Sequence, residues 1–84
     1  MKNFEISRAF NEIADILEIQ EENLFRIRAY RRAAQNVESL TEDVEAIAQR
    51  GDLTEVPGIG KDLAAKIQEY LQTGTMQELE RLRQ

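Results

Sequence analysis

The sequence predicts an all-α fold, a compact bundle of four to five short helices with one tight glycine corner. Apolar residues recur at every third or fourth position over most of the chain, which is the pattern of helices with one buried face. No stretch alternates apolar and polar residues as a strand would. The composition, 42% hydrophobic and 32% charged with a single proline, excludes disordered and collagen-like chains. We therefore expect residues 1–84 to form a single domain.

Glycines, the proline and polar turn residues divide the chain into helices. Those expected are Asn3–Leu17, Leu24–Ser39, a short helix after Thr41, Lys61–Thr73 and a final segment from Thr75. Asn3 and Thr41 are the expected N-caps, because their side-chain oxygens can accept hydrogen bonds from free amides of the first turn. Gly51 and Gly74 can adopt the left-handed conformation that ends a helix. Between Gly51 and Pro57 there is room for only one helical turn.

The absence of cysteine and histidine limits the available chemistry. There can be no disulfide, no thiolate metal site and no histidine base, so any catalysis must use Lys, Arg, Tyr or carboxylate side chains. The sequence also contains no recognisable signal peptide or membrane span. We expect a cytoplasmic monomer with no membrane partner.

Positive charge is concentrated in one segment of an acidic chain. The net charge is −5, which taken alone disfavours nucleic acid as a partner. Residues 23–36, however, contain four arginines and no acid; the arginines are Arg26, Arg28, Arg31 and Arg32. This distribution predicts one positive stripe on a negative body. A solvated helix face without a ligand is the alternative interpretation.

The segment Val56-Pro57-Gly58-Ile59-Gly60 predicts a tight corner that binds an anion. Gly58 and Gly60 allow backbone conformations and close approaches that a side chain would prevent. The helix expected from Lys61 begins with amides that lack intrahelical partners and carry the positive end of the helix dipole. Lys61 adds a formal charge, and Ile59 is expected to insert into the core. A simple connector between two helices is the other interpretation of this corner.

Together with the alanines of the following helix, this run resembles the helix-hairpin-helix motif of DNA repair and replication proteins. The resemblance implies binding to the phosphate backbone without sequence readout. It also implies that the backbone carbonyls of Thr54, Val56 and Ile59 coordinate a monovalent cation, Na⁺ or K⁺, which bridges to a phosphate. No other cofactor is expected for the domain.

A wider resemblance covers almost the whole chain from Phe4. The matching blocks are Arg28–Ala34, Val56–Lys61, Ala64–Ile67, Leu71–Gly74 and Glu80–Gln84. In this order they resemble the N-terminal 8-kDa domain of X-family (DNA polymerase beta-like) DNA polymerases, of the bacterial and archaeal type. The resemblance implies a DNA-binding domain for DNA repair synthesis at the nucleoid, followed by polymerase domains in a longer protein.

The same resemblance implies a site for gapped or nicked DNA, where the domain binds the 5′-phosphate of the downstream strand. Many family members also act as a lyase that removes a 5′-deoxyribose phosphate by β-elimination. Lys66 falls on the Schiff-base lysine, Tyr30 on a pocket tyrosine and Arg26 on a phosphate-binding lysine. The other residues expected to bind phosphate are Arg31, Gly58, Gly60 and Lys61.

Three positions depart from the family pattern. Phe25 stands at a pocket histidine, Asp62 at a second phosphate-binding lysine and Glu78 at a further basic residue. These departures bear on phosphate affinity and, through it, on the lyase rate.

Helical spacing gives an independent reason to consider Lys66. Its side chain lies about 100° from the centre of the apolar stripe of its helix, on the shoulder of the core. Partial burial there, near the arginines, predicts a lowered pKa for Lys66 and a larger neutral amine fraction. Tyr30 and Arg26, one turn apart, can present a hydroxyl and a guanidinium to one phosphate. Three functions stay open: a gap-binding lyase, a DNA-binding module without catalysis, and an acidic helical module that binds proteins.

Overall fold

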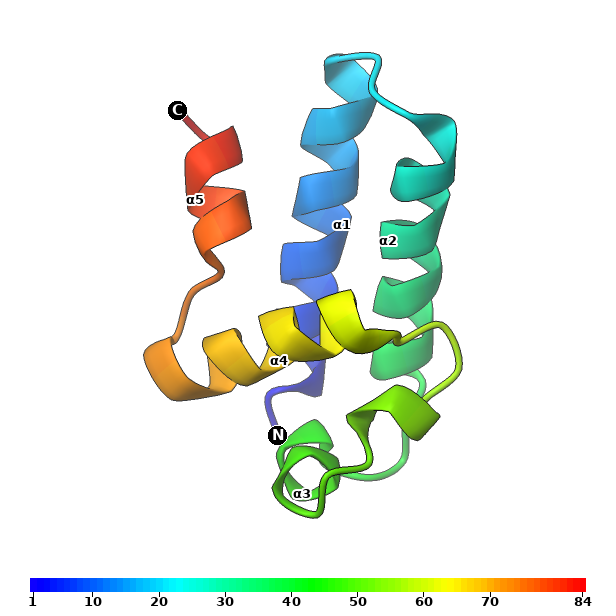
Figure 1. The fold of residues 1–84 in the computed structure, drawn as a ribbon, viewed down its shortest axis with the longest axis vertical. Coiled ribbons are helices and arrows are strands. Elements are labelled where there is room, and N and C mark those ends of the chain that lie inside the picture. Colours follow the sequence, from blue (N-terminus) through cyan, green and yellow to red (C-terminus); the bar gives the residue numbers. More distant parts are fainter.

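The computed structural model covers residues 1–84 and consists of helices and their connections (Figure 1). The elements are α1 (Asn3–Ile19), α2 (Leu24–Glu38), α3 (Val44–Gln49), a 3₁₀ turn η1 (Leu53–Glu55), α4 (Lys61–Thr73) and α5 (Gln77–Leu82). The predicted all-α bundle is therefore confirmed. None of these helices is both long enough and apolar enough to span a lipid bilayer.

The two longest helices, α1 and α2, lie side by side and antiparallel, and they form the framework of the fold (Figure 1). Their facing surfaces are apolar, and Phe10, Ala14, Ala33 and Ala34 are fully buried. Small alanine side chains allow the two helices to approach closely. The Ser7 hydroxyl donates a hydrogen bond to the Ala34 carbonyl at 2.8 Å, so this buried polar side chain is satisfied.

The remaining helices close the core around this pair. α4 crosses the end of α1 and α2 that lies near α3, and α5 returns beside α1 (Figure 1). The side chains that α4 and the following segment add to the core are Leu63, Ile67, Met76, Leu79 and Leu82. Arg83 Nε lies 2.6 Å from Glu12 Oε2, and this ion pair ties the end of α5 to α1. All five helices thus share a single core.

Asn3 is not the N-cap of α1, contrary to the prediction. The N-cap is Lys2, whose side chain accepts no hydrogen bond from the first turn. Asn3 is buried and joins α1 to α3 instead: its Nδ2 donates to the Glu42 carbonyl at 2.8 Å, and its Oδ1 accepts from the Val44 amide at 2.9 Å. Because both partners lie about forty residues further along the chain, local sequence does not reveal this role.

The other helix ends follow the local sequence more closely. Thr41 is wrong as the cap of α3, because Asp43 takes this role by accepting a hydrogen bond from the first turn at 3.0 Å. α4 has the predicted bounds, and Gly74 ends it in the left-handed conformation with φ +82°. α1 extends two residues beyond its predicted end, and α5 begins two residues after its predicted start.

The substitution Asn3→Ala should lower the free energy of unfolding by about 2 kcal/mol, because it leaves the Val44 amide buried without a partner. Urea denaturation followed by circular dichroism measures this loss. Asn23→Ala is the matched control: it removes the exposed cap of α2, which accepts from the Phe25 amide at 2.8 Å, and should cost about 1 kcal/mol. Equal losses in the two variants would show that the Asn3 bridge contributes no more than an ordinary cap.

Candidate functional site

The corner before α4 is built from a left-handed glycine and a buried isoleucine. Gly58 has φ +85°, a conformation that other residues rarely adopt. The Ile59 amide donates to the Val56 carbonyl at 3.0 Å, and the Ile59 side chain is 3% exposed, which confirms its predicted insertion into the core. Gly60 differs, because its φ of −88° is ordinary and an added Cβ would meet no atom within 4 Å. Neither backbone conformation nor packing therefore requires a glycine at position 60.

Asn36 fixes this corner against α2. Its Nδ2 donates a hydrogen bond to the Pro57 carbonyl at 2.7 Å. A Cβ added at Gly58 would lie 3.1 Å from Asn36 Nδ2 and 3.4 Å from Arg32 Cγ, so the corner packs directly on the arginine-bearing helix. Sequence reasoning missed Asn36, because its partner lies 21 residues away and nothing in the neighbouring sequence signals this contact.

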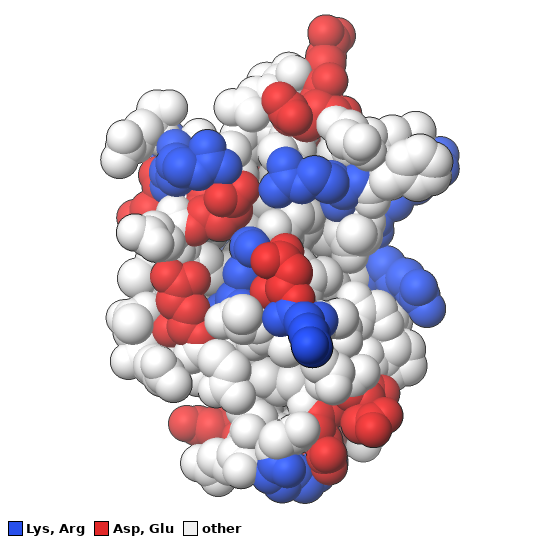
Figure 2. Space-filling model, viewed as in Figure 1, with Lys and Arg blue, Asp and Glu red and all other residues white.

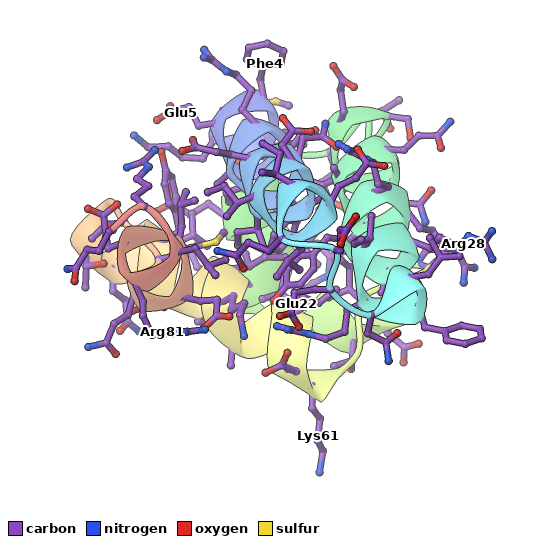
Figure 3. All side chains as sticks on the ribbon, turned by 90° about the horizontal axis from the view of Figure 1, so that it is seen from above. Phe4, Glu5, Glu22, Arg28, Lys61 and Arg81 are labelled. Atoms are coloured by element: carbon purple, nitrogen blue, oxygen red, sulfur yellow. The ribbon has the colours of Figure 1, made fainter.

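The first turn of α4 keeps its amides free for a ligand. Its N-cap is Gly60, which has no side chain to accept their hydrogen bonds. The starts of α2 and α3, in contrast, are capped by Asn23 and Asp43. Free amides and the positive end of the helix dipole together favour an anion at the start of α4. Lys61 extends from this point away from the body of the molecule (Figure 3).

The carbonyls predicted to hold a monovalent cation lie in the corner and just before it. The Val56 carbonyl accepts the turn hydrogen bond from Ile59, whereas the carbonyls of Thr54 and Ile59 accept no hydrogen bond from the protein backbone. Backbone carbonyl oxygens are suitable ligands for K⁺ and related ions. In chemical type, these three carbonyls therefore suit the monovalent cation that the family resemblance implies.

A second group of predicted residues lies where α2 faces α4 and α5. The Tyr30 ring is 3% exposed, and its centroid lies 5.8 Å from that of Phe10. The Arg26 guanidinium lies 5.9 Å from the centroid of the Tyr30 ring. Lys66 of α4 lines a hollow together with Glu78, the ion-pair partner of Arg26, and it also lies near Tyr30. The structure therefore brings Arg26, Tyr30 and Lys66 together, with Glu78 beside them.

Lys66 is held by an acid on its own helix. Its Nζ lies 3.1 and 3.2 Å from the two carboxylate oxygens of Asp62, and its side chain is only 17% exposed. Burial favours the neutral amine, but the hydrogen bonds to Asp62 and the charges of Asp62 and Glu78 outweigh it and raise the pKa of Lys66. The predicted lowering of this pKa is therefore wrong, because the nearest charge is the carboxylate one turn away.

Glu78 places a second carboxylate in this region. It lies 3.4 Å from Arg26 and 2.7 Å from Arg81. The hydrogen bond from Arg81 lowers the pKa of Glu78 despite partial burial, so the carboxylate stays ionised. An open, fully polar hollow lies beside α4 and α5; its lining residues are Lys66, Glu69, Gln77, Glu78, Glu80, Arg81 and Gln84. An anion that approaches Arg26 must therefore compete with Glu78.

Two further residues singled out in the sequence lie apart from these groups. Arg31 Nη2 lies 2.8 Å from Asp15 and 3.4 Å from Glu18, so its guanidinium joins α2 to α1 and is not near the corner. Phe25, at the start of α2, is 79% exposed and outside the core. Of the four arginines in the positive segment, Arg31 is thus the one most fully engaged within the protein.

Comparison with known proteins identifies the same motif, a helix-hairpin-helix. A family model described as a helix-hairpin-helix domain matches residues 1–76. The chain is also 32% identical over 82 residues to the DNA polymerase/3′-5′ exonuclease PolX of Bacillus subtilis (strain 168). This match covers 98% of the chain and 14% of the relative, so the chain spans only a small part of that polymerase. The resemblance to X-family DNA polymerases seen in the sequence is confirmed.

The two glycines of the corner should respond differently to the same change. Gly58→Ala puts a Cβ on a residue with positive φ and close to Asn36, so we expect it to lower the free energy of unfolding by about 1–3 kcal/mol. Gly60→Ala meets open space and should change it by less than about 0.5 kcal/mol. Urea unfolding of both variants measures the difference. Similar losses at the two positions would contradict the geometry of the corner.

Proposed function

Because the chain belongs to the helix-hairpin-helix domain family and is a DNA-binding domain, we propose that it binds gapped and nicked DNA without sequence preference. It binds there through the 5′-phosphate on the downstream side of the gap. The observation that carries the proposed binding to the DNA backbone is the uncapped start of α4 behind a corner that is fixed on the arginine-bearing helix. Backbone amides recognise a phosphate but carry no information about the base, which accounts for the lack of sequence preference.

The corner and the start of α4 form the first phosphate contact of this proposal. Free amides of the first turn donate hydrogen bonds to phosphate oxygens, and Lys61 adds a positive charge at the rim. The absence of a side chain at Gly60 leaves room for the DNA backbone to approach these amides. A Na⁺ or K⁺ ion held by the Thr54, Val56 and Ile59 carbonyls would supply a further positive charge opposite the phosphate.

The second contact binds the terminal 5′-phosphate at Arg26, Tyr30 and Lys66. The Arg26 guanidinium lies beside the buried Tyr30 ring, and the Lys66 ammonium group lies in the same region of the fold. Asp62 and Glu78 oppose binding, because a phosphate must weaken their ion pairs with Lys66 and Arg26. We expect this contact to be weaker than one built from basic residues alone, and to contribute modestly beside the corner.

Lyase activity is a second candidate function, favoured by the shielded position of Lys66 beside Tyr30. In this reaction the neutral Lys66 amine attacks the aldehyde carbon of the opened deoxyribose, and loss of water gives a Schiff base. Removal of a proton from the adjacent sugar carbon then expels the 3′-phosphate, and water later releases the sugar fragment from the lysine. The raised pKa of Lys66 keeps most of the amine protonated at neutral pH, so the reaction should be slow there.

The cellular setting of the proposed activity follows from the relative. Since that protein is named as a DNA polymerase and exonuclease, we place the domain beside polymerase domains in a longer chain, where it holds the far side of a gap during repair synthesis. A role in repair synthesis would place the protein at the nucleoid. The domain itself would supply binding and not nucleotide transfer.

The 5′-phosphate test uses gapped duplexes that differ only in that group. Wild-type protein should bind the phosphorylated gap more tightly than the unphosphorylated one, and Arg26→Ala should reduce this preference. Gly60→Ala should weaken binding to both duplexes while leaving the fold intact. Fluorescence anisotropy measures each affinity. If binding neither prefers the phosphate nor falls steeply with salt, the domain is a protein-interaction module instead.

Borohydride trapping on a pre-incised abasic site tests the lyase proposal. Wild-type protein should form a covalent adduct that Lys66→Ala abolishes. Asp62→Asn removes the main hydrogen-bond partner that raises the pKa of Lys66, so trapping at neutral pH should increase severalfold and its pH profile should move to lower pH. Absence of an adduct in both wild type and Asp62→Asn would leave a DNA-binding module without catalysis.

A further inference from the structure

Most positive charges of this protein are already neutralised by its own acids. Seven of the eleven lysines and arginines form ion pairs. The four that form none are Arg8, Arg28, Arg32 and Lys61. Arg8 lies on α1, with its guanidinium 5.8 Å from the centroid of the Phe4 ring. The other three lie on α2 and at the start of α4, on the elements that meet at the corner.

Arg28 and Arg32 extend the corner along the outer face of α2. Both side chains are exposed, and one helical turn, about 6 Å of helix axis, separates them. A Cβ added at Gly58 would lie 3.4 Å from Arg32 Cγ and 3.6 Å from Cδ, so the aliphatic part of the exposed Arg32 side chain packs next to the corner. Figure 3 shows Arg28 pointing outward from α2, and Figure 2 shows positive side chains along the edge where α2 runs.

We infer that Arg28 and Arg32 form an additional DNA-binding surface, which contacts backbone phosphates next to the phosphate held at the corner. This inference rests on the proposed function, because it extends the DNA from the corner along α2. A separation of about 6 Å spans roughly two phosphates of one strand of B-form DNA, at ~3.4 Å each along the axis. The two guanidinium groups can therefore meet different phosphates of the same strand.

Binding a phosphate should cost less electrostatic energy at Arg28 and Arg32 than in the Lys66 region. Residues 23–36 contain no acid, and neither arginine has an ion pair to give up when a phosphate arrives. Arg26 and Lys66, by contrast, are paired with Glu78 and Asp62. Most of the salt-dependent binding to duplex DNA should therefore come from α2 and the corner, and the 5′-phosphate preference from the Lys66 region.

The test compares charge removal at three unpaired arginines. Arg28→Gln, Arg32→Gln and their combination are titrated with gapped duplex, with and without the 5′-phosphate, over a range of KCl concentrations. Arg8→Gln is the matched control, since it removes the same charge from another arginine without an ion pair. Arg32→Lys keeps both charge and aliphatic stem, and thermal melting of each variant checks that the fold is retained.

Each of the two α2 substitutions should reduce the slope of log affinity against log salt by about 0.9. Arg8→Gln and Arg32→Lys should keep the wild-type slope, and no variant should change the ratio of affinities with and without the 5′-phosphate. An unchanged slope in the double variant, or an equal fall in Arg8→Gln, overturns the inference. If the wild type binds the two duplexes with equal affinity but the slopes change as expected, only the proposed recognition of the gap is refuted. A wild type that binds no DNA overturns both proposals.

Discussion

The hydrogen bond from Asn36 to the Pro57 carbonyl sets the position of the glycine corner, and the proposed DNA contacts depend on it. It holds Gly58 against α2, where the left-handed backbone of that glycine allows α4 to leave in a new direction. The direction of α4 in turn decides that Lys66 faces Tyr30 and that Lys61 projects into solvent. One side-chain contact thus positions both groups of residues that we propose to bind phosphate.

The arrangement of ion pairs matters more than the net charge for what this surface can bind. An acidic chain would repel a polyanion if its charges were evenly mixed. Here the acids neutralise most of the lysines and arginines, including those around Glu78, and leave Arg28 and Arg32 unpaired on a helix segment that contains no acid. Positive charge is therefore concentrated along this segment although the net charge of the molecule is negative, and the negative remainder restricts the orientations in which DNA can approach.

Sequence reasoning succeeded where the determining groups are neighbours in the chain. The bounds of α4 follow from the glycine before it and from Gly74 after it, and the corner follows from its own five residues. It failed where distant segments meet, as at Asn3, whose partners belong to α3, and at Asn36. The pKa of Lys66 was a different kind of error. The responsible acid, Asp62, stands four positions earlier on the same helix, and helical spacing could have revealed the pair.

The lack of histidine and cysteine has a consequence for how the domain responds to its surroundings. The side chains that most often gain or lose a proton between pH 5 and 8 are missing from this protein. Contacts with arginine lower the pKa values of Glu12, Glu42 and Glu78, and those with Asp62 raise the pKa of Lys66, which moves these groups further from neutrality. These four groups therefore keep their charges near neutral pH. Near neutral pH, we therefore expect the affinity of the domain for a polyanion to depend on ionic strength more than on proton concentration.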